Sequence, residues 1–162
     1  MMRTVRRELK EWLSNVERIV IAGIGNPIRM DDYVGVKVIN DLRGRVSNKV
    51  LLIECETVPE IYIHQIVNFR PTHILLIDAA ALGLNPGEVK LLKPEELEVY
   101  SAFSTHALPL RVFCECLIRM VNAKIMLLLV QPKLTDFGEG LTPEVLSSER
   151  EIVNFLSNVL PR

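Results

Sequence analysis

Residues 18–32 read RIVIAGIGNPIRMDD, an apolar run that ends in a Gly-x-Gly turn and is followed by two adjacent carboxylates. Such a run predicts a buried parallel strand entering a tight turn, and Asp31 and Asp32 open a periodic segment that predicts a helix to about Arg43. Ligands of open α/β sheets bind beyond the carboxyl ends of the strands. We therefore expect the functional site at this turn, with residues from other strand ends converging on the two carboxylates.

The Gly23-x-Gly25 pair also begins a dinucleotide-binding fingerprint, which needs a third glycine where this chain has Ile28. Two carboxylates at a helix N-terminus would also repel a pyrophosphate. Nucleotide binding is therefore disfavoured. One carboxylate of the Asp31-Asp32 pair is explained equally well as a helix cap, and since a cap needs a single Asp, capping and ligation remain compatible.

Strand-like and helix-like segments alternate along the chain. This alternation favours a three-layer α/β/α sandwich with a mostly parallel sheet, and the tight turn at 83–87 predicts one antiparallel strand, so we expect a mixed five-stranded sheet. No composition break divides the chain, so a single domain over 1–162 is expected, with an N-terminal helical extension at about 1–16. The expected strands are 18–24, 50–55, 73–78, 88–92 and 124–131, and the expected helices are 3–14, 32–43, 59–69, 107–122 and 142–159.

Composition excludes several classes of function. The net charge is −1 and the charges are scattered, which disfavours nucleic-acid and anionic-lipid partners. The apolar stretch at 125–130 is far shorter than the roughly 20 residues of a membrane helix, and Met1–Lys10 lacks a secretory apolar region. Three cysteines, an odd number, argue against a disulfide framework and for a reducing cytoplasm. Cys114 and Cys116 lie about 200° apart around a helix, so they cannot easily share a metal.

Two further candidate site residues lie at element boundaries. Asp78 ends an apolar strand, where a local turn is an equally open interpretation, and His106 stands just ahead of a helix, where a local hydrogen-bonding role is the alternative. With Asp32, they form a set of two carboxylates and one imidazole. Such a set suits a divalent ion of intermediate hardness, such as nickel, zinc or manganese, with a coordination position left for water or substrate.

Other polar residues are weaker candidates. His64 lies within a predicted helix and His73 begins a strand, so we interpret both as structural. Glu54 and Glu56 flank Cys55 at the end of the second strand and approach the same sheet edge. They add negative potential there or contact the partner.

Four sequence blocks follow one another along residues 18–145. They are GIGN-x4-DD-x2-G at 23–35, IDAA at 77–80, STH-x-L at 104–108, and QP at 131–132 with FGEGLTP at 137–143. Together and in this order they resemble the nickel-iron hydrogenase maturation endopeptidases. The resemblance implies a five-stranded α/β fold of the phosphorylase/hydrolase-like kind. It also implies a cytosolic protease that removes a short C-terminal peptide from the hydrogenase large subunit after nickel insertion. The last two blocks are most similar to the branch serving energy-converting or formate-linked hydrogenases.

By position, the resemblance implies that Asp32, Asp78 and His106 are the metal-contacting and catalytic residues. The chain departs from the family pattern at 54–57, where many members have Asp-Gly-Gly-Thr and this chain keeps only the type of Thr57. A differently shaped substrate groove is expected there, with the proposed ligands intact.

These residues suggest a substrate-assisted mechanism. Nickel already bound in the large-subunit precursor would dock against the three residues, and the peptide bond would be attacked by water held either by a carboxylate base or by the metal. Neither a Gly-x-Ser-x-Gly elbow nor a His-Glu-x-x-His helix is present. Oxygen ligands without a thiolate predict weak affinity, so the free enzyme is expected to be metal-free. We expect a monomer that meets the precursor transiently, with the loops at 79–86 and 134–141 as candidates for gripping its tail.

Two alternatives come from other classes of function. A non-catalytic nickel-dependent maturation chaperone would keep the same ligands without cleavage. The segment Gly23–Pro27 also resembles the opening of bacterial peptidyl-tRNA hydrolases, but the His-Asn pair that follows it in that family is missing, and the balanced charge fits a tRNA poorly.

Overall fold

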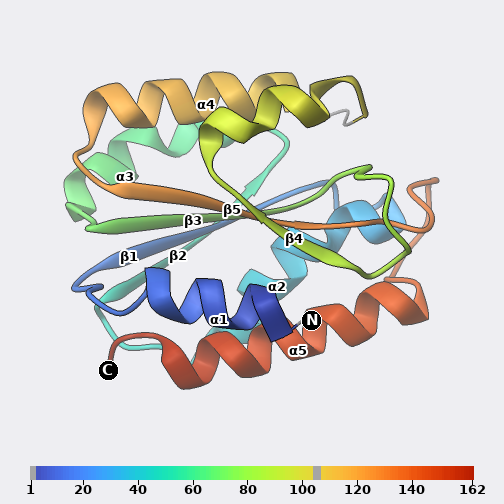
Figure 1. The fold of residues 1–162 in the computed structure, drawn as a ribbon, viewed down its shortest axis with the longest axis horizontal. Helices are drawn as coiled ribbons and strands as arrows, with labels where there is room; N and C mark the ends of the chain where they lie inside the picture. Colours follow the sequence, from blue (N-terminus) through green and yellow to red (C-terminus); the bar gives the residue numbers. More distant parts are fainter. Residues whose placement is uncertain (1–2, 104–106) are drawn as a thin grey trace.

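The computed structural model describes residues 3–103 and 107–162. In this part of the chain five strands form one sheet, in the order β2-β1-β3-β5-β4 (Figure 1). Strand β4 runs antiparallel to β5, and the other three pairings are parallel. The mixed, mostly parallel five-stranded sheet predicted from the sequence is therefore confirmed. The strands are β1 Ile19–Ile24, β2 Val50–Glu56, β3 His73–Ala79, β4 Val89–Leu92 and β5 Lys124–Val130.

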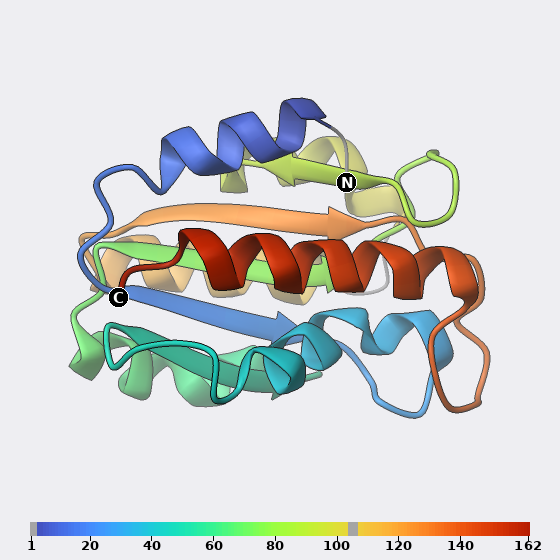
Figure 2. The ribbon, with the colours of Figure 1, turned by 90° about the horizontal axis from the view of Figure 1, so that it is seen from below.

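Helices cover both faces of this sheet and complete the three layers. Helices α1 (Arg3–Trp12), α2 (Val34–Leu42) and α5 (Pro143–Val159) lie on one face, and α3 (Ile63–Phe69) and α4 (Ala107–Met120) lie on the other (Figures 1 and 2). No helix in the described segments is long and apolar enough to cross a membrane.

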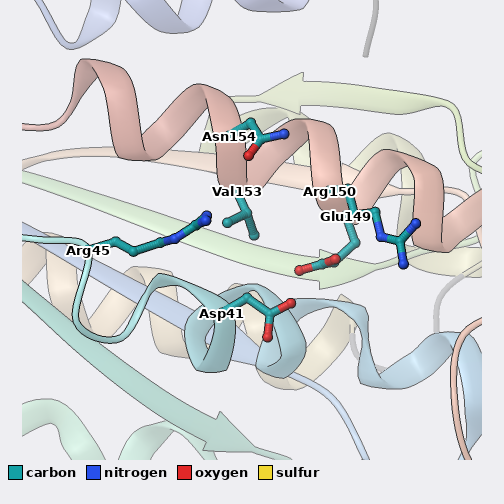
Figure 3. Close-up of a pocket in the computed structure, with 6 residues that line it drawn as sticks. All are labelled: Asp41, Arg45, Glu149, Arg150, Val153 and Asn154. Atoms are coloured by element: carbon teal, nitrogen blue, oxygen red, sulfur yellow. The ribbon is translucent and has the colours of Figure 1, made fainter.

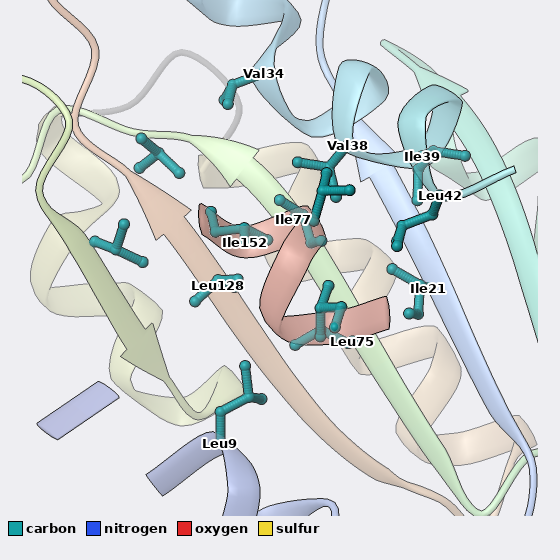
Figure 4. Packing of buried hydrophobic residues seen from close by; sticks show 14 of the residues in the cluster. Leu9, Ile21, Val34, Val38, Ile39, Leu42, Leu75, Ile77, Leu128 and Ile152 are labelled. Atoms are coloured by element: carbon teal, nitrogen blue, oxygen red, sulfur yellow. The ribbon is translucent and has the colours of Figure 1, made fainter. Parts of the chain in front are cut away.

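Alternation along the buried strands builds two hydrophobic layers. In β1, Ile19 and Ile21 face the cluster under α1, α2 and α5, whereas Val20 and Ala22 face the cluster under α4. Strands β1 and β3 are buried along their whole length, as central parallel strands covered on both faces must be. The first cluster includes Leu9 of α1, so the N-terminal helix packs on the sheet (Figure 4).

Two glycines bring the start of α2 against the sheet. A Cβ at Gly35 would overlap the carbonyl oxygens of Ile24 and Ile77, and a Cβ at Gly25 would overlap the carbonyl oxygen of Asp32. Gly25 also has a φ of +142°, which side-chain-bearing residues rarely adopt. The Gly-x-Gly turn therefore serves close backbone approach, and it fixes the Asp31-Asp32 turn at the end of β1.

Two of the expected helices contain 3₁₀ turns that the sequence did not predict. The expected helices at 32–43 and 59–69 each begin as a 3₁₀ turn, η1 (Met30–Tyr33) and η2 (Pro59–Tyr62), before becoming α-helical. In η1 the amide of Asp32 donates to the carbonyl of Arg29, the tighter i→i+3 pattern. A further 3₁₀ segment, η3 (Pro94–Phe103), was not predicted.

Candidate functional site

Asp32 and Asp78 are placed at the same edge of the sheet. Asp78 lies near the end of β3, and Asp32 lies in η1, the first element after β1, which pairs with β3 in parallel. The close contact of Gly35 with both strand ends holds η1 at this edge. The structure therefore brings two of the predicted site residues to neighbouring strand ends. The third, His106, lies outside the described residues.

Backbone amides orient both carboxylates. Asp32 is 5% exposed, and its Oδ2 accepts a hydrogen bond from the amide of Asn26 at 2.9 Å. Asp78 is 1% exposed, and its Oδ1 accepts from the amide of Ala79 at 2.8 Å. The Asp78 bond goes to the amide of the next residue in the strand. Both side chains have fixed positions, as groups that bind or react at a strand end require.

Asp31 has a different role from its neighbour. Its fully buried carboxylate accepts hydrogen bonds from the amides of Lys133 (2.9 Å), Leu134 (3.0 Å) and Thr142 (2.7 Å). The Thr142 hydroxyl also donates to it, at 2.8 Å to Oδ2. No side chain caps η1 or α2, so the helix-capping role considered for one aspartate of the pair is wrong. Its carboxylate instead anchors the loop between β5 and α5.

The chemistry at this edge is that of oxygen ligands. Carboxylates suit divalent ions, and the imidazole expected to complete the set belongs to His106. Within residues 3–103 and 107–162, no group of three His, Cys, Asp or Glu side chains is arranged to hold a metal ion. The described residues therefore supply two carboxylates at this edge and no complete metal site of their own.

The cysteines contribute little to such a site. All three are free thiols, and burial raises the pKa of Cys55 and of Cys114 to about 12. Thiols of this kind are protonated at neutral pH, so they are poor nucleophiles and poor ligands.

The remaining polar candidates have structural surroundings. His73 is buried, its Nδ1 lies 2.8 Å from the Thr72 hydroxyl, and Trp12 packs edge-on against its ring, which agrees with the structural interpretation. Its pKa is lowered by burial and by nearby Lys124. Glu54 forms an ion pair with Arg43 at 3.2 Å. Glu56 holds the turn through its carbonyl oxygen, which accepts from the amide of Gly25 at 2.7 Å.

A groove of about 400 Å³ lies elsewhere, between α2 and α5 (Figure 3). Glu149 of α5 is fully buried there, and neither carboxyl oxygen accepts a hydrogen bond from the described residues. Burial is the main cause that raises its pKa to about 7, and the charge of Asp41 adds to the shift. No local sequence pattern marks this group, because Glu149 lies in a helix of ordinary amphipathic pattern. The residues that line the groove are Asp41, Arg45, Glu149, Arg150, Val153 and Asn154.

Comparison with known proteins gives a consistent result. Residues 36–159 match the family model of the HycI hydrogenase maturation protease. A putative hydrogenase maturation protease of Methanocaldococcus jannaschii is 36% identical over 164 residues, covering 96% of each chain. The hydrogenase 3 maturation protease of Escherichia coli K12 is 27% identical over 126 residues, covering 78% of this chain and 80% of that one. The crystal structure of a [NiFe] hydrogenase maturation protease HycI from Thermococcus kodakarensis superimposes with a TM-score of 0.86 at 32% identity, covering 94% and 98% of the two chains.

Proposed function

Because this chain belongs to the hydrogenase maturation protease family, we propose that it is an endopeptidase that removes the C-terminal peptide of a nickel-iron hydrogenase large-subunit precursor. Cleavage follows nickel insertion, and the enzyme recognises the nickel that the precursor carries. The protein acts in the cytoplasm as a single domain, as a monomer that meets the precursor transiently.

One observation carries this proposal. Asp32 and Asp78 emerge at neighbouring ends of the parallel strands β1 and β3, and both carboxylates are held by backbone amides. They occupy the motif positions that the resemblance assigns to metal contact, and His106 occupies the third. We propose that these three residues receive the nickel of the precursor, which is therefore part of the substrate.

The chemistry follows from the same residues. Contact with nickel would hold the precursor so that the C-terminal peptide bond lies at the sheet edge. Orientation of this kind lowers the barrier because the reacting groups no longer have to meet by diffusion. The attacking water is activated by a carboxylate acting as base or by the nickel of the substrate, which are alternative routes to hydrolysis.

The test is a cleavage assay on nickel-loaded and nickel-free precursor, with loss of the C-terminal peptide followed by mass spectrometry. We expect nickel-dependent cleavage by the wild type and a loss of at least about 100-fold in Asp32→Asn, Asp78→Asn and His106→Ala. Asp41→Asn and His64→Ala carry the same substitutions outside the site and are expected to cleave normally.

Other outcomes would change the proposal. Stable binding of loaded precursor without cleavage would support the chaperone alternative. Equal cleavage of loaded and nickel-free precursor would contradict nickel recognition. Full activity of the folded Asp32→Asn and Asp78→Asn variants would remove these residues from the site.

A further inference from the structure

Two loops leave the sheet at the edge that carries Asp32 and Asp78, and they differ in how far their apolar side chains are exposed. In the loop after β3, Ala80 and Leu82 are buried. The Leu82 amide donates a hydrogen bond to Oε1 of Gln131 at 2.6 Å. In the loop after β5, Leu134 is 42% exposed and Phe137 is 81% exposed. Of the two loops considered from the sequence as grips for a substrate tail, only the second has large apolar side chains that are well exposed.

The exposed loop is paired with the turn that follows β1. A parallel bridge joins Arg29 to Gly138, with the Gly138 amide donating to the carbonyl of Ile28 at 2.9 Å and the Met30 amide donating to the carbonyl of Gly138 at 3.2 Å. Ile28 is itself 56% exposed. We call the paired segments 26–30 and 134–138 the apolar ribbon.

Arg29 stiffens the ribbon from within. Its Nε donates to the carbonyl of Thr135 at 3.0 Å, and its guanidinium lies 5.6 Å from the centre of the Phe137 ring. The cation therefore supports the ring from one side. Exposed apolar side chains that gather in one patch are typical of interaction surfaces.

The ribbon is continuous with the candidate site. Its first segment begins at Asn26, whose amide binds the Asp32 carboxylate, and Asp31 holds the base of the second segment through the amides of Lys133 and Leu134. The exposed side chains are thus fixed relative to Asp32. A surface fixed in this way loses little conformational entropy when a partner binds.

We propose that the apolar ribbon binds an apolar side chain in the C-terminal segment of the large-subunit precursor, beside the bond to be cut. This inference rests on the proposed function. The nature of the occupant follows from the surface. Ile28, Leu134 and Phe137 present apolar groups, and Arg29 is already engaged with Thr135 and Phe137. A partner that covers the Phe137 ring removes water from it, and this favours an apolar side chain of the partner over a charged one.

The experiment compares Phe137→Ser and Ile28→Ser with the wild type on nickel-loaded precursor, measuring kcat and KM separately. We expect KM to rise about 10-fold in Phe137→Ser with kcat little changed, since only binding contacts are lost. Phe137→Leu should recover most of the affinity. Ile118→Ser is the matched control, because Ile118 is 58% exposed on α4, outside the ribbon.

A second arm identifies the occupant. Serine substitution of apolar residues next to the scissile bond in the precursor should raise KM in the wild type, and should add little further in Phe137→Ser because both changes remove the same contact. Additive effects of the two changes would overturn the inference.

The outcomes separate this inference from the proposed function. Cleavage by the wild type with an unchanged KM in Phe137→Ser overturns the ribbon's role and leaves the protease intact. If the wild type does not cleave, the binding of loaded precursor is measured instead, and equal binding by wild type and Phe137→Ser overturns the inference. A wild-type dimer in analytical ultracentrifugation that Phe137→Ser converts to a monomer would show that a second copy of the chain occupies the ribbon.

Discussion

Asp31 and Glu149 are both fully buried carboxylic acids, but their surroundings are opposite. The Asp31 carboxylate accepts from three backbone amides and one hydroxyl. The Glu149 carboxyl has no donor among the described residues and faces the carboxyl of Asp41 across the α2–α5 groove. Burial by itself therefore does not determine whether a carboxyl group stabilises this fold.

The difference follows from what takes the place of the water that each carboxyl group loses on folding. Donors aimed at Asp31 substitute for the water that the carboxylate loses on folding, so the charged form is accommodated. At Glu149 no donor makes up for the lost water, and the neutral form is favoured, which raises its pKa to about 7. One residue holds a loop in place through its charge, and the other weakens helix packing when it is charged.

Removing the acceptor at Asp31 should have the largest effect on stability. Asp31→Ala leaves the buried donors of Lys133, Leu134 and Thr142 without their acceptor, and we expect the free energy of unfolding to fall by about 3 kcal/mol. Urea unfolding followed by circular dichroism measures this. Asp136→Ala, at an exposed position, should change it by less than about 0.5 kcal/mol.

The amide analogue sharpens this test. Asp31→Asn keeps the size of the side chain but turns an NH₂ group toward backbone donors, so a loss of about 2 kcal/mol is expected. An unfolding free energy equal to that of the wild type would show that the negative charge of Asp31 is not required. The contrast drawn between Asp31 and Glu149, which rests on donors to a charged carboxylate, would then be wrong.

The sequence predicted the sheet well because its signals are local. The apolar run at 19–24, the turn at 83–87 and the alternation of elements each depend on neighbouring residues, and together they give the observed mixed sheet. The two segments that pair as the apolar ribbon lie far apart in the chain. Arg29 and Thr135, which are hydrogen-bonded across the ribbon, are 106 residues apart. No local pattern indicates such a contact.

The same distinction explains the candidate site. Asp32 and Asp78 were selected as candidates because each lies at or beyond the end of an apolar run, and the strand ends of a parallel sheet share one edge. The role of Asp31 was missed because its partners lie 102 to 111 residues away. The local sequence pattern treats the two adjacent aspartates alike. The family resemblance selected Asp32, and the role of Asp31 follows only from the positions of its donors.

The next largest effect is expected at Glu149 and depends on pH. A folded-state pKa of about 7, above the ordinary value of 4.5, means that the folded protein binds the proton more tightly than the unfolded chain does. This contribution to stability is complete below about pH 4.5 and is lost as the pH rises through about 7. Glu149→Gln should therefore be more stable than the wild type at pH 8, by about 1–2 kcal/mol because water in the open groove screens part of the charge, and equally stable at pH 4.5.

Unfolding free energies at four or five pH values between 4.5 and 8 test this. The groups that face Glu149 are Asp41, which raises its pKa, and Lys37 and Arg150, which lower it. Glu151→Gln, on an exposed ion pair of the same helix, is the matched control and should leave the pH profile unchanged. Parallel profiles for the wild type and Glu149→Gln would contradict a raised pKa.

The smallest effect concerns Lys37, whose Nζ lies 2.8 Å from Asp41 Oδ2 one helical turn away. Lys37→Gln removes this partly exposed pair, and a loss of about 0.5 kcal/mol is expected, which should shrink in 1 M salt. Because Lys37 also lowers the pKa of Glu149, its removal should move the Glu149 transition to higher pH, and the shift should vanish when Glu149→Gln is already present. A transition that stays in place would mean that Lys37 acts on Asp41 alone. If Lys37 shifts the pH transition of Glu149 but the pKa stays raised, a positive charge nearby does not replace hydrogen-bond donors on the carboxyl oxygens. Asp31 has such donors and Glu149 lacks them among the described residues.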